Sequence, residues 1–140
     1  MADNFSAQVA DWAHAVEGAH ETIFKESVQR LVTELNTLVP VGETAFLRSS
    51  LQASSSAMPA LVRENPGVAD ADYVAEITLV IAGTDLGETI YLGYTANYSH
   101  WVHFGTSRMT GRPWVTMAGQ RWSQIVREVE AEVMARLGLA

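Results

Sequence analysis

The chain has 140 residues, and its hydrophobic fraction of 48% and charged fraction of 18% are typical of a single globular domain over residues 1–140 rather than of a disordered segment. It contains no cysteine, which excludes disulfides and thiolate chemistry. The net charge of −7 argues against a general nucleic-acid coat and against a binder of anionic membranes, because phosphate contacts need a positive surface.

The N-terminal part of the chain predicts a long helix. It lacks the basic start and apolar run of a signal peptide, and no stretch has the roughly 20 apolar residues of a membrane span, so we expect a soluble protein that stays where it is made. Apolar residues recur at steps of three or four from Phe5 to Leu38, before Pro40 and Gly42. About 34 residues would be roughly 50 Å long, more than the roughly 30 Å of a compact domain this size. Either Gly18 breaks the helix, or one end reaches past its own domain to a neighbour.

The middle of the chain predicts strands separated by turns. A Pro/Gly turn precedes a short apolar piece at 46–51 and a Ser-rich run, which we interpret as an edge strand, although strand boundaries within 50–72 are not determined by the pattern. After a turn at 65–72, apolar residues alternate and predict a second strand, and a further strand follows at 89–95. The alternating residues are Tyr73, Ala75, Ile77, Leu79 and Ile81.

The C-terminal part predicts two helices around a loop. Residues 97–104 are expected to form a short helix ended by Gly105, and residues 105–112 a loop. Pro113 is expected to begin a last amphipathic helix that Gly138 closes. The predicted fold class is therefore α+β: a long N-terminal helix, an antiparallel sheet of three to four strands, a short helix and a C-terminal amphipathic helix. The apolar residues of that last helix are Trp114, Ala118, Trp122, Ile125, Val129, Val133 and Leu137.

Charge is distributed unevenly along the chain. No acid lies between Glu88 and Glu128, whereas four arginines do, and the rest of the chain has a net charge of −11. A basic corner of one copy that meets an acidic flank of another would be a head-to-tail contact, and such contacts close into rings when the rotation allows. The four arginines are Arg108, Arg112, Arg121 and Arg127.

The pair His100 and His103 raises the question of a metal site. On a helical turn, residues three apart share a face, but zinc needs a third protein ligand. No acid lies nearby in the sequence, and His14 or His20 would have to reach across from the first helix. We therefore expect no metal site and two partly exposed histidines beside Trp101.

Catalysis and nucleotide binding are weaker interpretations of the same stretch. Ser99, Ser107 and other hydroxyls lie near the histidines, without a nucleophile-elbow pattern or an orienting carboxylate. Arg108 and Arg112 could grip phosphate with a tryptophan stacked on a base, or pair with acids on the surface, or contact a neighbouring copy. We expect the aromatic residues Trp101, Phe104 and Trp114 to belong to the core.

Two motifs resemble those of one protein family: the small tail-completion proteins (tail terminators or head–tail joining proteins) of long-tailed bacteriophages, prophages and gene-transfer particles. The first is the stretch YSHWVHFGTSRMTGRPW at 98–114, and the second is VPVGETAFLRSSL at 39–51. His103 stands where the family usually has Glu, and Ala45 where it has Gly. The first motif's structural residues are Tyr98, Trp101, Val102, His103, Phe104, Gly105, Pro113 and Trp114; the second motif's are Pro40, Val41, Thr44, Leu47, Arg48 and Ser50.

The resemblance implies a virion structural protein of the neck, at the top of the tail, assembled in the host cytoplasm. Such proteins close the head-proximal end of the tail tube as a ring, commonly of six copies, and join it to the head connector. The implied partners are further copies of the chain, the tail tube protein, the head connector or stopper, and DNA that passes through the lumen without sequence-specific binding; no enzyme activity, cofactor or membrane is implied. The expected contact loop to the next subunit or the tube comprises Thr106, Ser107, Arg108, Met109, Thr110, Gly111 and Arg112.

Two alternative functions remain open. One is a head-side connector or stopper of the neck, which has a similar size and ring architecture but another partner. The other is a small binding domain or metal-dependent enzyme that shares the fold by analogy alone. Metal content or turnover distinguishes the second alternative from a structural role.

Overall fold

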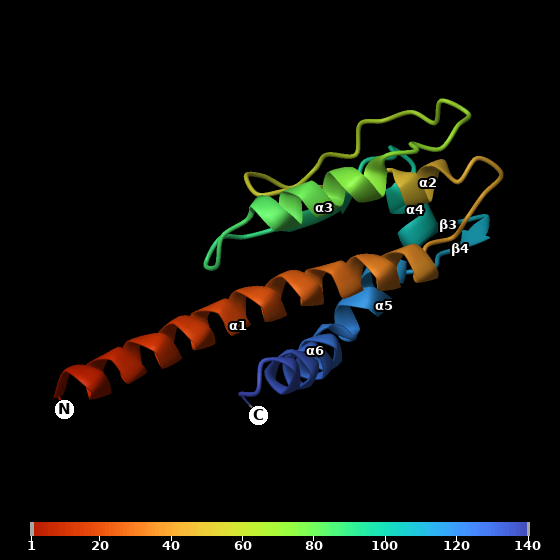
Figure 1. Cartoon of the computed structure of the whole chain (residues 1–140). Coiled ribbons are helices and arrows are strands. Elements are labelled where there is room, and N and C mark those ends of the chain that lie inside the picture. Colours follow the sequence, from red (N-terminus) through yellow and green to blue (C-terminus); the bar gives the residue numbers. More distant parts are fainter. Residues whose placement is uncertain (1, 140) are drawn as a thin grey trace.

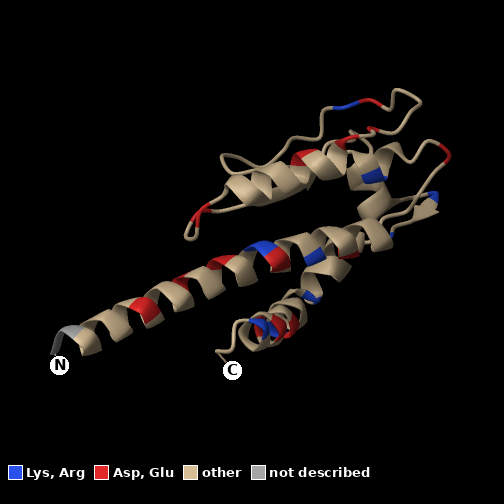
Figure 2. Cartoon of the chain, viewed as in Figure 1, with Lys and Arg blue, Asp and Glu red and all other residues tan. Residues whose placement is uncertain are grey.

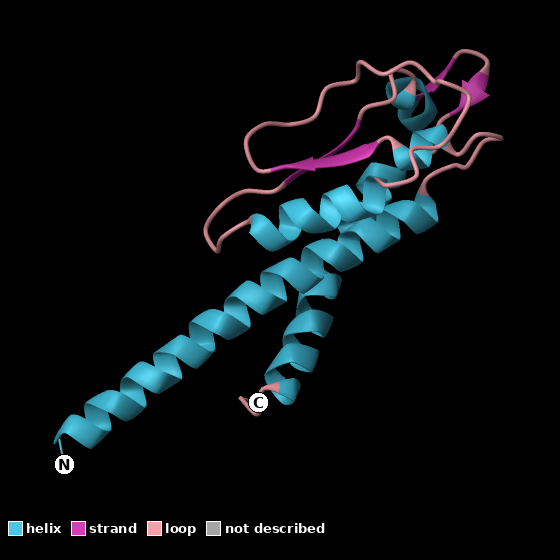
Figure 3. Ribbon diagram, turned by 45° about the horizontal axis from the view of Figure 1, so that its top comes forward, coloured by secondary structure: helices cyan, strands magenta, loops and turns pink. Residues whose placement is uncertain are grey.

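The computed structural model describes residues 2–139; Met1 and Ala140 lie outside the described residues (Figure 1). Helices dominate the fold, and the strands are short (Figure 3). In chain order the elements are α1 (Ala2–Leu38), α2 (Phe46–Ser49), β1 (Leu51–Ser54), α3 (Tyr73–Gly83), β2 (Tyr91–Tyr94), α4 (Ser99–Phe104), β3 (Gly105–Thr106), β4 (Met109–Thr110), α5 (Trp114–Gln120) and α6 (Trp122–Arg136).

The long N-terminal helix is confirmed, and Gly18 does not interrupt it. α1 has 37 residues, which corresponds to about 55 Å. Its C-terminal half packs into the core, for example through Val28 and Val32, whereas Ala19 is the first fully buried residue along it. The N-terminal end of α1 therefore extends beyond the rest of the molecule, as Figure 1 shows.

The C-terminal helix lies against α1, but it is divided into two. α5 and α6 meet at Arg121, and Pro113 lies immediately before the first helical residue instead of being that residue. Ile125, Val129 and Val133 of α6 pack against Ala19 of α1. Two ion pairs, Arg30 with Glu132 and Arg136 with Glu26, join the same two helices.

The predicted helix end at Gly138 is confirmed. Its φ of 70° is the left-handed conformation that glycine adopts without a Cβ clash. The Gly138 amide donates to the Ala135 carbonyl at 3.2 Å and the Leu139 amide to the Met134 carbonyl at 2.8 Å. These two bonds form a Schellman motif, which satisfies carbonyls at the end of α6.

The sheet is smaller than predicted. β1 and β2 pair antiparallel, with Leu51 opposite Tyr94, and β3 and β4 form a separate two-stranded hairpin. The predicted strand at Tyr73–Gly83 is wrong, because this segment is helix α3. Ile77 and Ile81, four residues apart, are buried, as they are on one face of a helix. The α+β class therefore holds, with two two-stranded sheets within residues 2–139 in place of one sheet of three to four strands.

One core cluster joins elements from both ends of the chain. It includes Val32 and Leu35 of α1, Phe46 of α2, Ile77 of α3 and Trp114 of α5. The Tyr94 and Trp114 rings meet edge to face with centroids 5.2 Å apart. No helix within residues 2–139 is long and apolar enough to cross a membrane.

Candidate functional site

The two motifs, separated by about fifty residues of sequence, lie at the same corner of the fold. A hollow of about 510 Å³ is lined by residues 40–47 on one side and by Tyr98, Val102 and Met109 on the other. The rings of Phe46 and Tyr98 lie 6.4 Å apart between centroids. We call this the motif corner, defined by residues 40–50 and 98–114.

Arg112 fastens the first motif to the end of α1. Its backbone amide donates to the Val102 carbonyl at 2.9 Å, and its side-chain Nε donates to the Leu38 carbonyl at 2.8 Å. Carbonyls in the last turn of a helix have no partner within the helix, so the guanidinium satisfies one of them. This bond places the start of the second motif, at Pro40, directly beside the end of the contact loop.

The second motif forms a tight turn before α2. Thr44 Oγ1 accepts a hydrogen bond from the Phe46 amide at 3.3 Å. Ala45 has a φ of 54°, and it is the one non-glycine residue with positive φ among residues 2–139. This left-handed conformation favours glycine, the residue that the resembled motif has at this position. Ala45 therefore holds a backbone conformation that is strained for a residue with a Cβ.

The other residues of the second motif differ in burial, and Ser50 at its end is hydrogen-bonded on both sides. Leu47 and Ser50 are buried, whereas Arg48 is half-buried and Val41 is exposed. The Ser50 hydroxyl donates to the Leu47 carbonyl at 2.7 Å. The Ser50 carbonyl in turn accepts from the amide and the hydroxyl of Thr95, at 2.9 and 2.8 Å. These bonds connect the second motif to the strand that leads into the first.

The short helix α4 confirms one part of the sequence prediction and contradicts another. Trp114 is buried as expected, and Tyr98 and Val102 pack against the core. Trp101 and Phe104, which were predicted to belong to the core, are 55% and 68% exposed. The buried positions of α4 are instead Ser99 and His103, and the helix turns the two aromatic side chains outward. Two large apolar groups thus lie on the surface beside the contact loop.

The contact loop is a small hairpin that leaves and returns at two glycines. Gly105 has a φ of 87°, and it pairs with Thr110 across β3 and β4. A Cβ on Gly105 would come within 2.5 Å of the Gly111 nitrogen, closer than real Cβ atoms lie. Between the glycines the side chains are exposed. The exposed residues are Thr106, Ser107, Arg108, Met109 and Thr110.

The histidines of the first motif lie in different environments. His100 is exposed, whereas His103 is buried, which corrects the prediction that both are partly exposed. The Nε2 atom of His103 lies 3.4 Å from the Thr116 hydroxyl, and its ring packs 5.4 Å from that of Trp114. Burial lowers the pKa of His103, and the nearby His100 lowers it further. No group of three or more potential metal ligands occurs within residues 2–139.

The arginines of the acid-free segment differ in their partners. Arg121 pairs with Glu34 of α1 at 3.2 Å, whereas surface pairing was considered for Arg108 and Arg112. Arg112 binds a backbone carbonyl instead. Arg108 is exposed at the tip of the contact loop and makes no ion pair within the described part of the chain. Figure 2 shows a basic position on the β3–β4 hairpin, apart from the acidic positions along α1.

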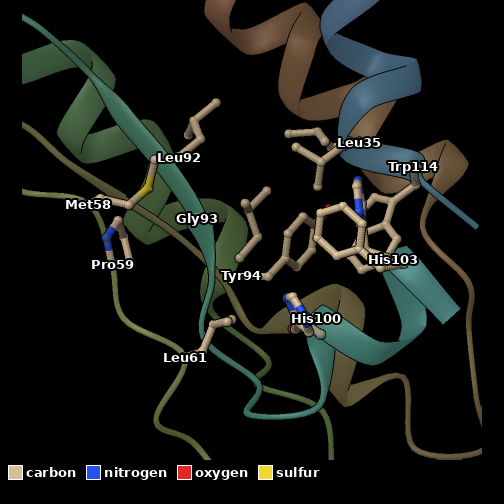
Figure 4. Close-up of a pocket in the computed structure, with 14 residues that line it drawn as sticks. Leu35, Met58, Pro59, Leu61, Leu92, Gly93, Tyr94, His100, His103 and Trp114 are labelled. Atoms are coloured by element: carbon tan, nitrogen blue, oxygen red, sulfur yellow. The ribbon is translucent and has the colours of Figure 1, made fainter. Parts of the chain in front are cut away.

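A second hollow, on the other side of α4, was not anticipated from the sequence. This groove encloses about 320 Å³ between the loop at 58–61, β2, α4 and α5, and its walls are almost entirely apolar (Figure 4). A Cβ on Gly93 would come 3.1 Å from Met58 Sδ, so the loop crosses β2 at close range. In the sequence, the apolar run at 58–62 that follows the serines was the one signal that this loop packs against the rest of the fold. The lining residues are Leu35, Leu51, Met58, Pro59, Leu61, Leu92, Gly93, Tyr94, Ser99, His100, His103, Phe104, Trp114 and Val115.

Comparisons of the chain with protein-family models, with curated proteins and with solved structures found no match.

Proposed function

We propose that this chain is a virion structural protein that caps the head-proximal end of a phage tail tube as a ring and joins it to the head connector. The proposal starts from the resemblance of the two motifs to those of tail-completion proteins. The observation that supports it is the motif corner, where both motifs line one hollow and Arg112 bonds to the end of α1. Motifs that are matched by chance have no reason to meet in space.

The exposed groups of the motif corner are suited to contact with another protein. The contact loop carries Met109, which is exposed, and Arg108, which has no intramolecular ion pair among the described residues. Trp101 and Phe104 expose apolar surface beside the loop. Aromatic, methionine and arginine side chains are enriched in protein–protein interfaces. In the proposed ring of six copies, this loop contacts the next subunit or the tail tube, and DNA passes through the lumen.

Termination of the tube follows from the asymmetry of such a ring. One face matches the last ring of tube subunits, and the other face has no further binding edge for them, so polymerisation stops. The net charge of −7 suits a lumen that lets DNA pass without binding it tightly.

The decisive experiment measures tail length by negative-stain electron microscopy in particles made without the gene. Overlong or ragged tails beside filled, tailless heads would support the proposal. Tails of normal length beside heads that leak would favour the head-side connector or stopper. Unchanged particles would refute both neck functions.

A further inference from the structure

His103 lies on the buried side of the short helix α4 with few polar contacts. Its side chain is 9% exposed, and its Nδ1 atom has no hydrogen-bond partner among the described residues. Its Nε2 atom lies 3.4 Å from the Thr116 hydroxyl, which is longer than an ordinary hydrogen bond. The imidazole is therefore held mainly by packing against the rings of Phe104 and Trp114.

The rings behind His103 are also incompletely paired. Trp114 Nε1 and the Tyr94 hydroxyl are buried and make no hydrogen bond within residues 2–139. The Trp114 ring lies 5.2 Å from that of Tyr94 and 5.4 Å from that of His103, so the three polar atoms belong to one cluster of rings (Figure 4). Buried polar groups without partners are less stable than the same groups in water. Opening of the fold at this cluster therefore has a low cost.

The surroundings of His103 contain no anion that could pair with its protonated ring. The groove beside α4 has two further titratable residues in its lining, His100 on α4 and Tyr94 on β2, and α1, β1 and the loop at 58–61 contribute only apolar residues. α5 has no charged residue. The contact loop contributes cations alone, Arg108 and Arg112. A positive charge on His103 is thus left unpaired by these neighbours.

Protonation of His103 consequently favours an open position of α4. Burial lowers the pKa of His103, and the nearby His100 lowers it further. In an open position the ring is in water, where its ordinary pKa is about 6.5. The open position therefore binds the proton more tightly, and opening becomes easier as the pH falls through this value. Between about pH 7.5 and 5.5 the equilibrium constant for opening should rise by up to about tenfold.

Movement of α4 is transmitted directly to the contact loop. Gly105 follows α4 without an intervening residue, and its amide donates to the Trp101 carbonyl. At the other end of the loop, the Arg112 amide donates to the Val102 carbonyl at 2.9 Å. The outer side of α4 adds no restraint, because Trp101 and Phe104 are exposed. The position of the contact loop therefore depends on how α4 packs.

We propose that His103 is a pH-sensitive latch, which holds α4 and the contact loop in place when it is neutral and releases them when it is protonated, while the rest of the fold persists. The motif that the chain resembles has Glu at this position, whose ordinary pKa of about 4.3 is lower, so sensitivity near neutral pH is a property of this chain. The latch does not depend on the proposed function, since it concerns the position of the loop whatever the loop contacts.

Hydrogen exchange of backbone amides, followed by NMR at about pH 7.5 and 5.5, tests the latch. The amides of Gly105 and Arg112 report opening of α4, and those of Val28 and Val32 in the core of α1 report global unfolding. Each rate is divided by the exchange rate of an unstructured amide at the same pH, which gives the equilibrium constant for opening. Low concentrations of urea separate local opening, which urea barely changes, from global unfolding.

Two variants assign the effect to one imidazole. His103→Gln removes the titrating ring, and His100→Gln is the matched control on the exposed side of the same helix. Opening at Gly105 and Arg112 should rise up to about tenfold at the lower pH in the wild type and to a similar extent in His100→Gln, but by less than about twofold in His103→Gln. Circular dichroism checks that both variants are folded, and NMR titration of the wild-type imidazoles measures the pKa of His103 without any substitution.

Four results would overturn the latch. An equal rise in His103→Gln would assign the effect to another group. Opening at Gly105 and Arg112 that does not change with pH would mean that the proton is not linked to α4. Opening there that depends on urea as steeply as in the core would mean that α4 moves only when the whole chain unfolds. A measured pKa of His103 at or above about 6.5 would contradict the latch even if His103→Gln failed to fold.

Discussion

Replacement of Gly111 by alanine should displace the contact loop and destabilise the fold. A Cβ at this position would lie 2.5 Å from the Gly105 nitrogen and 2.7 Å from the His103 carbonyl oxygen. Both are backbone atoms, so no side chain can rotate to make room. Overpacking of this kind costs about 1–3 kcal/mol. For a domain of this size we expect the melting temperature to fall by about 3–10 °C.

Gly119→Ala is the matched control for this substitution. Gly119 lies in α5, and a Cβ there would have no neighbour within 4 Å. Alanine is the better helix former, so the control should gain about 0.5–1 kcal/mol. The same chemical change is therefore expected to have opposite signs at the two positions.

Two assays separate global from local effects. Urea unfolding followed by circular dichroism reports the free energy of unfolding, and limited trypsin digestion reports opening of the loop at the exposed Arg108. Gly111→Ala should lower the free energy of unfolding and accelerate trypsin cleavage at Arg108. Unfolding and cleavage that both match wild type would refute the close approach between the two ends of the hairpin.

Three further predictions concern the core, the buried histidine and the contact loop. Ile125→Ala, in the interface of α6 with α1, should lower the unfolding free energy by about 2–5 kcal/mol, whereas Leu79→Ala on the surface should change it by about 0.5 kcal/mol or less; equal effects would contradict the packing of these helices. Because burial lowers the pKa of His103 in the fold, the unfolded chain takes up the proton more readily, and stability should be lost as the pH falls below the ordinary value of 6.5. Urea unfolding at about pH 7.5 and 5.5 should show a smaller loss for His103→Gln, and an equal loss in both chains would rule out this assignment. Arg108→Glu should keep the circular dichroism spectrum of the wild type. If Arg108 contacts the next subunit, native mass spectrometry should show that rings are lost; if it faces the lumen, rings should persist and DNA retention should fail. An unfolded variant would contradict both positions.

The long helices were predictable because their patterns extend over many turns. α1 and α6 repeat apolar residues at helical spacing for long enough to identify them as helices and to locate the end of α6, although the break at Arg121 that begins α6 was not predicted. The helix at Tyr73–Gly83 was not predictable, because the apolar residues among its eleven positions fit both the two-residue period of a strand and the 3.6-residue period of a helix. Alternation suggested a strand, yet Leu79 of that pattern is 73% exposed, and burial at Ile77 and Ile81 follows the helical period. A short apolar run therefore does not distinguish a helix from a strand.

The residues of the motif corner could be identified from the sequence, but their packing could not. α4 has apolar residues on both sides, so the sequence does not specify which side is buried. The structure buries Ser99, whose hydroxyl donates to the Ala96 carbonyl at 2.7 Å, and leaves Trp101 and Phe104 outside. The groove depends on a loop that crosses β2, a contact between Met58 and Gly93, about 35 residues apart, that no local pattern encodes.

The pairing of α1 with α6 also determines when the chain can fold. Arg30 and Glu132, which join these helices, are 102 residues apart in sequence. During synthesis α1 leaves the ribosome long before α6 exists, so the part of α1 around Ala19 that packs on α6 stays uncovered until α6 emerges. We therefore expect a nascent chain that stops before Trp114 to be insoluble or bound by chaperones. Completion of the fold is thereby coupled to completion of translation through α6, and assembly-competent subunits arise only from chains that have passed that point.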